Sequence, residues 1–155
     1  MKAKLVLSLV MVGLLITVAA CSSVNAESNG IQKNSQKTVE ATIEEFSQNK
    51  NLSNTIEMNN GDTLTLILGA NPTTGFAWQE QAQISDKAVL EQTDHEYVGP
   101  ASQDGQQPVV GASGKNVWAF KSLKTGTSEV SLNYGRPWEG GEKGEWTFKL
   151  TVVVK

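Results

Sequence analysis

The segment "EWTFKLTVVV" near the C-terminus alternates large apolar residues with Thr, Lys and Val. A period of two is the signature of a β-strand with one buried face. The segments "TLTLILG" and "EVSLNY" show the same alternation. The residues predicted to face inward are Leu64, Leu66, Leu68, Val130, Leu132, Tyr134, Trp146, Phe148, Leu150, Val152 and Val154. Such strands must bury their apolar faces against one another, so the chain is predicted to fold as packed β-sheets.

Weaker strand candidates occupy much of the chain after Ser53. They are "NTIEM", "FAWQEQA", "VLEQTDHEYV" and "KNVWAFKSL". With Gly, Pro and Asn turns between them and no convincing helix, about seven to eight strands favour an all-β, immunoglobulin-like antiparallel β-sandwich. A β-barrel is the alternative. The segment "TVEATIEEF" fits either a short helix or an extra strand.

The N-terminal segment "MKAKLVLSLVMVGLLITVAAC" places Lys2 and Lys4 before an apolar stretch that runs from Leu5 to Ala20. This order is typical of a secretory signal, and the stretch is shorter than the roughly 20 residues that span a bilayer. "VAAC" resembles a bacterial lipobox, and Cys21 is the only cysteine. The resemblance implies a lipoprotein signal peptide at residues 1–20, a lipidated Cys21, and export to the cell envelope with a lipid anchor in its membrane. Ordinary cleavage that leaves a free thiol is the alternative.

The residues after Cys21 are rich in Ser, Asn, Gln, Lys and Glu, as in "SSVNAESNGIQKNSQK". Such a composition offers little to bury, so residues 21–51 are predicted to form a lipidated N-terminus and a flexible tether. Residues 52–155 are predicted to form one folded domain, a size that suits a single core.

The charge pattern argues against nucleic acid as a partner, and the cysteine content argues against a disulfide. Without the two lysines of the signal peptide, 11 basic residues remain against 16 acidic ones, and they form no cluster. The sequence therefore predicts no nucleic-acid binding. A single cysteine permits no disulfide within the chain, so the fold must depend on its core. We expect a monomer.

Residues for catalysis or metal binding are scarce. His95 is the only histidine, and no nucleophile-elbow sequence accompanies it, so it is predicted to be a solvent-exposed strand residue. One histidine and one cysteine cannot form a Cys/His zinc site. No glycine motif for phosphate binding is present. The sequence predicts no metal, no cofactor and no enzymatic activity.

The four tryptophans are of different kinds. Trp78 and Trp146 follow strand alternation and are predicted to lie in the core. Both faces of the strand that contains Trp118 are apolar, so its orientation stays open. Trp138 lies on a glycine-rich loop beside Arg136, a combination typical of binding hot spots. Equally, Trp138 could fold back over the end of the sandwich.

Three long connections separate the predicted strands: "ANPTTG", "GPASQDGQQPVVGASG" and "GRPWEGGEKG". They are predicted to follow every second strand. In a sandwich such connections emerge at the same end, so the three loops are expected to meet there.

Together the loops resemble those of the chagasin-like family of cysteine peptidase inhibitors, whose NPTTG, GxGG and RPW motifs occur in this order. The matching residues are Asn71, Pro72, Thr73, Thr74 and Gly75, then Gly111, Ala112, Ser113 and Gly114, then Arg136, Pro137 and Trp138. Ser113 departs from the pattern, at a position where glycine would permit a conformation or a close approach that a side chain hinders. The resemblance covers roughly residues 54–155.

This resemblance implies an immunoglobulin-like fold and reversible inhibition of papain-like (clan CA) cysteine peptidases. Thr73 and Thr74 would lie over the catalytic centre of the peptidase. Trp138 would pack on an aromatic surface of the enzyme, with Arg136 and Pro137 fixing its loop. The second loop would contact the opposite wall of the cleft through its backbone.

Two other functions fit the residues alone. An envelope- or carbohydrate-binding lipoprotein would use Trp138 at the loop tip to stack on sugars. A hydrolase would have to use His95.

Overall fold

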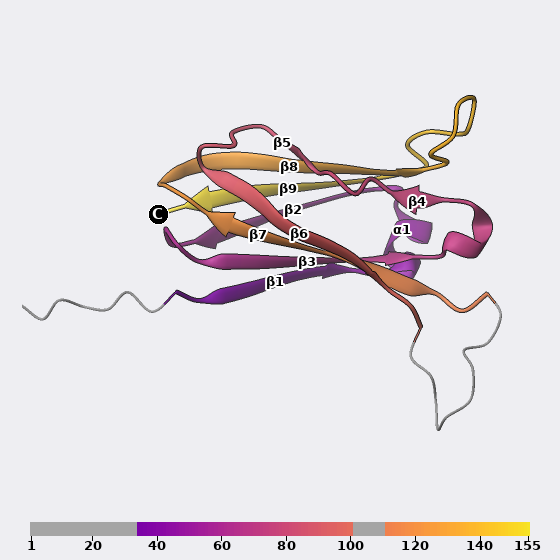
Figure 1. The fold of residues 1–155 in the computed structure, drawn as a ribbon, viewed down its shortest axis with the longest axis horizontal. Helices are drawn as coiled ribbons and strands as arrows, with labels where there is room; N and C mark the ends of the chain where they lie inside the picture. The colour runs from indigo at the N-terminus through magenta and orange to yellow at the C-terminus, as the bar shows by residue number, and fades with distance from the viewer. Residues whose placement is uncertain (1–33, 101–110) are drawn as a thin grey trace, which may run out of the picture. The chain divides into compact units, whose positions relative to one another are not determined.

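Two β-sheets pack face to face in the computed structural model, which describes residues 34–100 and 111–155 (Figure 1). The predicted signal peptide and Cys21 lie outside the described residues. The elements are β1 (Gln36–Ala41), α1 (Ile43–Gln48), β2 (Asn51–Met58), β3 (Thr63–Ala70), the 3-10 turn η1 (Pro72–Thr74), β4 (Ala77–Trp78), β5 (Gln83–Ile84), β6 (Leu90–Val98), β7 (Gly114–Ser122), β8 (Gly126–Gly135) and β9 (Trp146–Val154).

The strand order is β1-β3-β7-β6 in one sheet and β2-β9-β8-β4 in the other, with β5 also paired to β8. The prediction of an all-β, immunoglobulin-like sandwich is confirmed. The sheets are mixed rather than purely antiparallel, because β1 runs parallel to β3 and β2 runs parallel to β9. Parallel neighbours need a crossover connection, and α1 with β2 forms the crossover between β1 and β3.

The core contains the residues that alternation predicted to face inward. Leu66, Leu132 and Leu150 are completely buried, as are most of the other predicted residues, while Trp146 is half-buried against the core. Trp78 is buried as predicted, and Trp118, whose orientation the sequence left open, is also buried. The paired inward faces therefore supply most of the apolar burial that stabilises the fold.

The folded domain begins earlier than predicted. Residues 36–48 belong to the sandwich as β1 and α1 instead of the tether, so the predicted boundary at residue 52 is wrong. Thr42 caps α1: its hydroxyl accepts from the backbone N–H of Glu45, and its own N–H donates to the Glu45 carboxylate. "TVEATIEEF" is thus a strand followed by a helix.

Phe46 fixes α1 to the core. Its side chain is 0% exposed, and its ring stacks on Trp146 with 5.2 Å between centroids and lies 5.1 Å from Trp78. The helix approaches β3 so closely that a Cβ on Gly69 would lie 2.8 Å from the backbone nitrogen of Ile43. Gly69 therefore has to be a glycine for α1 to pack here.

We predict that Phe46→Ala lowers the free energy of unfolding by about 3–5 kcal/mol, because it empties a fully buried aromatic site. Gln48→Ala, at an exposed position of the same helix, should change it little. Urea denaturation followed by fluorescence measures both. Equal stability of Phe46→Ala and wild type would mean that α1 is not part of the cooperative fold.

Asp62 organises the turn between β2 and β3. Its side chain is only 2% exposed, and its carboxylate accepts hydrogen bonds from the backbone N–H groups of Ser35 and Asn59, both at 2.8 Å. These bonds hold the pKa of the Asp62 carboxyl below its ordinary value. The ionised side chain thus joins the start of β1 to the β2–β3 turn.

A depressed folded-state pKa means that ionised Asp62 stabilises the fold above its unfolded-state pKa, and that this contribution is lost as pH falls through the folded-state value. Asp62→Asn should lower Tm at pH 7, and its difference from wild type should shrink below about pH 4. Glu91→Gln, at an exposed position on β6, is the control. A difference for Asp62→Asn that stays constant from pH 7 to pH 3 would contradict this account.

Candidate functional site

The three motif-bearing loops meet at one end of the sandwich, as predicted (Figure 1). Strand register brings them together. Ala70, just before the first loop, pairs with Gly114 of the second, and Ala77 pairs with Gly135, just before the third. The first loop is therefore hydrogen-bonded at its base to both neighbours.

The first loop, residues 71–75, is rigid because its polar groups bind one another. Asn71 Oδ1 accepts from the backbone N–H of Thr73 at 3.2 Å and from its hydroxyl at 2.6 Å. The Thr74 hydroxyl donates to the Asn71 carbonyl at 2.6 Å. Pro72 begins the 3-10 turn, and Gly75 leaves it with φ +79°, a conformation that favours glycine. Both threonine hydroxyls are thus occupied within the loop.

Asn71 also joins this loop to the rest of the site. Its backbone N–H donates to Tyr134 Oη at 3.1 Å, and that hydroxyl donates to the Asn71 carbonyl at 3.3 Å. Its Nδ2 donates to the carbonyl of Gly111 at 3.1 Å. Asn71 therefore fixes the first loop to β8 and to the second loop at once.

The second loop is described from Gly111 onward. Gly111 has φ +86°. A Cβ on Gly114 would lie 2.5 Å from the carbonyl oxygen of Val98 and would collide with the Tyr97 hydroxyl. Ser113, which departs from the family pattern, is exposed. The close backbone approach in this loop therefore requires glycine at Gly114.

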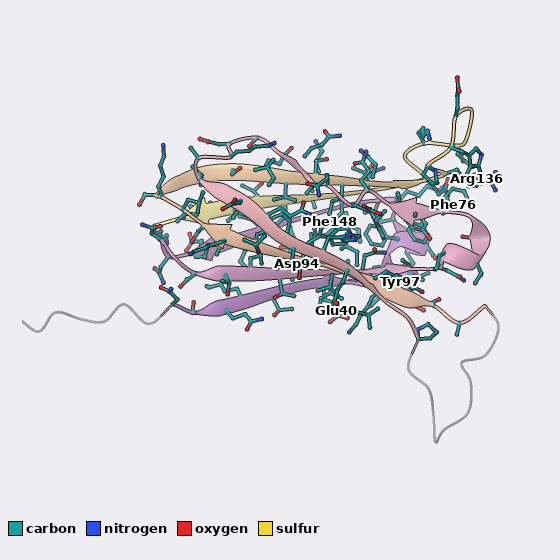
Figure 2. The ribbon with its side chains drawn as sticks, in the orientation of Figure 1. Glu40, Phe76, Asp94, Tyr97, Arg136 and Phe148 are labelled. Atoms are coloured by element: carbon teal, nitrogen blue, oxygen red, sulfur yellow. The ribbon has the colours of Figure 1, made fainter. Side chains whose placement is uncertain are left out.

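The third loop rests against the first. A Cβ on Gly75 would lie 3.0 Å from the indole of Trp138, so the ring covers this glycine. The Arg136 guanidinium carbon lies 4.7 Å from the Phe76 ring centroid and 5.7 Å from that of Trp138. Figure 2 shows Phe76 and Arg136 beside each other at this end. Trp138 remains 51% exposed, so it both packs on the first loop and presents a large apolar surface.

An ion pair ties the base of the third loop to the segment after α1. Lys50 Nζ lies 2.6 Å from Glu145 Oε1. The hydrogen bond and the charge of Glu145 raise the pKa of Lys50, and the hydrogen bond from Lys50 lowers the pKa of Glu145. The Lys50 side chain is largely exposed, so solvent screening leaves this pair a small contribution to stability.

His95 lies on a strand, β6, as predicted, but it is half-buried rather than solvent-exposed. Its Nε2 lies 2.9 Å from Asn116 Oδ1, and its ring packs 4.9 Å from Trp118.

Within residues 34–100 and 111–155, no three acidic, His or Cys side chains cluster as metal ligands. No helix in the same ranges has the length and apolar character to cross a membrane.

Residues 57–152 match the model of the chagasin family peptidase inhibitor I42. The chain belongs to this family. It is 33% identical over 106 residues to chagasin of Trypanosoma cruzi, and the aligned region covers 62% of this chain and 90% of chagasin. It is 27% identical over 101 residues to amoebiasin-2 of Entamoeba histolytica, and that aligned region covers 65% of this chain and 77% of amoebiasin-2.

The fold is shared with a solved relative. The crystal structure of a cysteine protease inhibitor from Entamoeba histolytica aligns with a TM-score of 0.57 at 22% identity, over 77% of this chain and 97% of that one. As a chagasin-family protein, the chain is a peptidase inhibitor rather than an enzyme. β1 and α1 lie before the residues that the family model matches.

Two contributors to the site were missed in the sequence. Tyr134 was predicted only as a core residue, and Phe76 only as part of a weak strand. A signal existed for Tyr134, since a buried tyrosine hydroxyl needs a hydrogen-bond partner and this strand ends at a motif-bearing loop.

We predict that Asn71→Ala lowers the free energy of unfolding by about 1 kcal/mol, since the cap of the first loop and the bond to Gly111 are lost. Because the loop is then less ordered, the variant should also inhibit peptidases more weakly. Asn54→Ala, at an exposed position on β2, is the matched control. Urea denaturation and an inhibition titration measure the two effects. An Asn71→Ala variant that inhibits as strongly as wild type would contradict the role given to Asn71.

Proposed function

We propose that this chagasin-family protein inhibits papain-like cysteine peptidases by inserting the first loop into the active-site cleft, with the second and third loops on either side. One observation carries the proposal. Asn71 holds the first loop to Gly111 of the second, and Trp138 of the third covers Gly75 of the first. The three loops thus form one continuous edge. Thr73 and Thr74 lie at its centre and would face the catalytic thiol.

The first loop is suited to block the thiol without being cleaved. Its backbone is a 3-10 turn, in which the Asn71 carbonyl accepts from the N–H of Thr74 and the Pro72 carbonyl accepts from the N–H of Gly75. Cleavage requires a peptide carbonyl in attack geometry close to the nucleophile. A turn closed by its own hydrogen bonds does not offer its carbonyls in this way.

Preformed loops also favour tight binding. Ordering a side chain on association costs about 0.5–1.5 kcal/mol, and hydrogen bonds already made in the free inhibitor reduce that cost. Arg136 and Trp138 are of the types that dominate interface energies. Protease–inhibitor interfaces of the usual size, about 1,600 Å² in total, can be very tight.

Titration of the domain against papain tests the proposal, and we expect competitive inhibition below micromolar concentration. Absence of inhibition at tens of micromolar, across papain and related peptidases, would contradict it.

We predict that Trp138→Ala weakens inhibition of papain by about 30-fold or more, since an exposed tryptophan at the edge would be a hot spot worth about 2 kcal/mol. Leu123→Ala is the control: it also truncates an exposed apolar side chain, 40% exposed, after β7. Inhibition constants and Tm are measured for both variants. Unchanged inhibition by Trp138→Ala would remove the third loop from the interface.

The proposal also includes the location of the protein in the cell. A lipid on Cys21, after removal of residues 1–20, would hold the inhibitor at the extracytoplasmic side of the cell envelope as a monomer. The support is the sequence pattern of a charged start, an apolar stretch and "VAAC". Mass spectrometry of the protein from its native host should find an acylated Cys21 at the N-terminus; an unmodified Cys21 would contradict the anchor.

A further inference from the structure

The third loop is long and rich in glycine. Residues 136–145 join β8 to β9, and this connection is much longer than the two to five residues of common hairpin loops. It contains Gly140 and Gly144, with φ +71° and +68°, as well as Gly141. Glycines lose the most conformational freedom when they are ordered. A fixed position for Trp138 therefore requires bonds across the loop.

Lys143 supplies such bonds. Its ammonium group donates to the carbonyl oxygen of Trp138 at 2.8 Å and to the carbonyl oxygen of Arg136. These two residues flank Pro137 on the outgoing arm of the loop, while Lys143 lies on the returning arm. A lysine ammonium has three donors, so one side chain can hold both carbonyls.

Two backbone hydrogen bonds join the same two arms. The Arg136 N–H donates to the Glu142 carbonyl at 2.7 Å, and the Gly141 N–H donates to the Trp138 carbonyl at 3.1 Å. The Trp138 carbonyl thus receives one backbone donor and one charged donor. Charge-assisted hydrogen bonds are of a stronger type than neutral ones, so the exposed Lys143 adds charged donors to the backbone bonds of the loop.

The Lys143 ammonium binds backbone carbonyl groups rather than a carboxylate. The ion pairs among the described residues join Lys50 to Glu145, Lys149 to Glu129 and Lys155 to Glu57. None of them, within residues 34–100 and 111–155, includes Lys143. A long side chain loses rotamer freedom when it is fixed, and two carbonyl acceptors at one position offset that loss.

We propose that Lys143 is a positioning residue of the inhibitory edge. It locks the outgoing arm of the third loop, so that the Trp138 ring lies over Gly75 before a peptidase binds. The inference rests on the proposed function for its effect on inhibition, but the locked loop is a property of the free protein. Without the lock, binding would have to order the loop, and affinity would fall.

The experiment compares Lys143→Met, which keeps the length of the side chain and removes its donors, with Lys143→Arg, which keeps charged donors. Lys149→Met, on the exposed side of β9, is the matched control. Each variant is measured by its inhibition constant against papain, its Tm, and acrylamide quenching of tryptophan fluorescence. Quenching reports mainly on Trp138, which is 51% exposed, because Trp78 and Trp118 are buried and Trp146 is half-buried against the core.

Lys143→Met should weaken inhibition by about tenfold and increase quenching, with Tm changed little because the loop lies outside the core. Lys143→Arg should recover most of both effects, and Lys149→Met should behave as wild type. Wild-type inhibition and quenching in Lys143→Met would overturn the proposal, as would a loss that Lys143→Arg shares in full. If wild type itself fails to inhibit papain, the proposed function is contradicted, and the quenching comparison still decides whether Lys143 locks the loop.

Discussion

The hydrogen bonds of Asn71 are the interaction on which the functional end of this protein depends. One side chain caps the 3-10 turn through Oδ1 and reaches the second loop through Nδ2, while its backbone binds the hydroxyl of Tyr134. Without these bonds the two threonines would sit on a free turn. With them, the first loop has a single conformation fixed to the sandwich, and the neighbouring loops are placed relative to it.

The sandwich provides the rigid support that those bonds require. Tyr134 can orient Asn71 because its ring is held in an aromatic cluster, stacked 4.5 Å from Trp146 and 5.7 Å from Phe76. Phe46 of α1 packs against Trp146 and Trp78 and so extends the same cluster. The N-terminal elements therefore do more than cover the edge of β3, because they complete the packing under the loops.

Much of this could be predicted from sequence because the signals are local. Alternation identified the inner faces of β3, β8 and β9, and the order of the connections placed the loops at one end. The rest depends on contacts between distant residues. Asn71 and Tyr134 are 63 positions apart, and parallel pairing of β1 with β3 is decided by the crossover, not by either strand. The sequence left open whether "TVEATIEEF" forms a helix or a strand, because Phe46 is the only buried residue of α1 in a segment that is mostly polar.

We infer that the inhibitory edge exists before the peptidase binds. A crystal structure of the complex with papain tests it most directly. We expect the first loop in the active-site cleft with the backbone of residues 71–75 within about 1 Å of its free conformation, and with the Asn71 bonds to Tyr134 and Gly111 intact. A first loop that has unwound into an extended strand in the cleft, or a peptidase bound at another face of the sandwich, would contradict it.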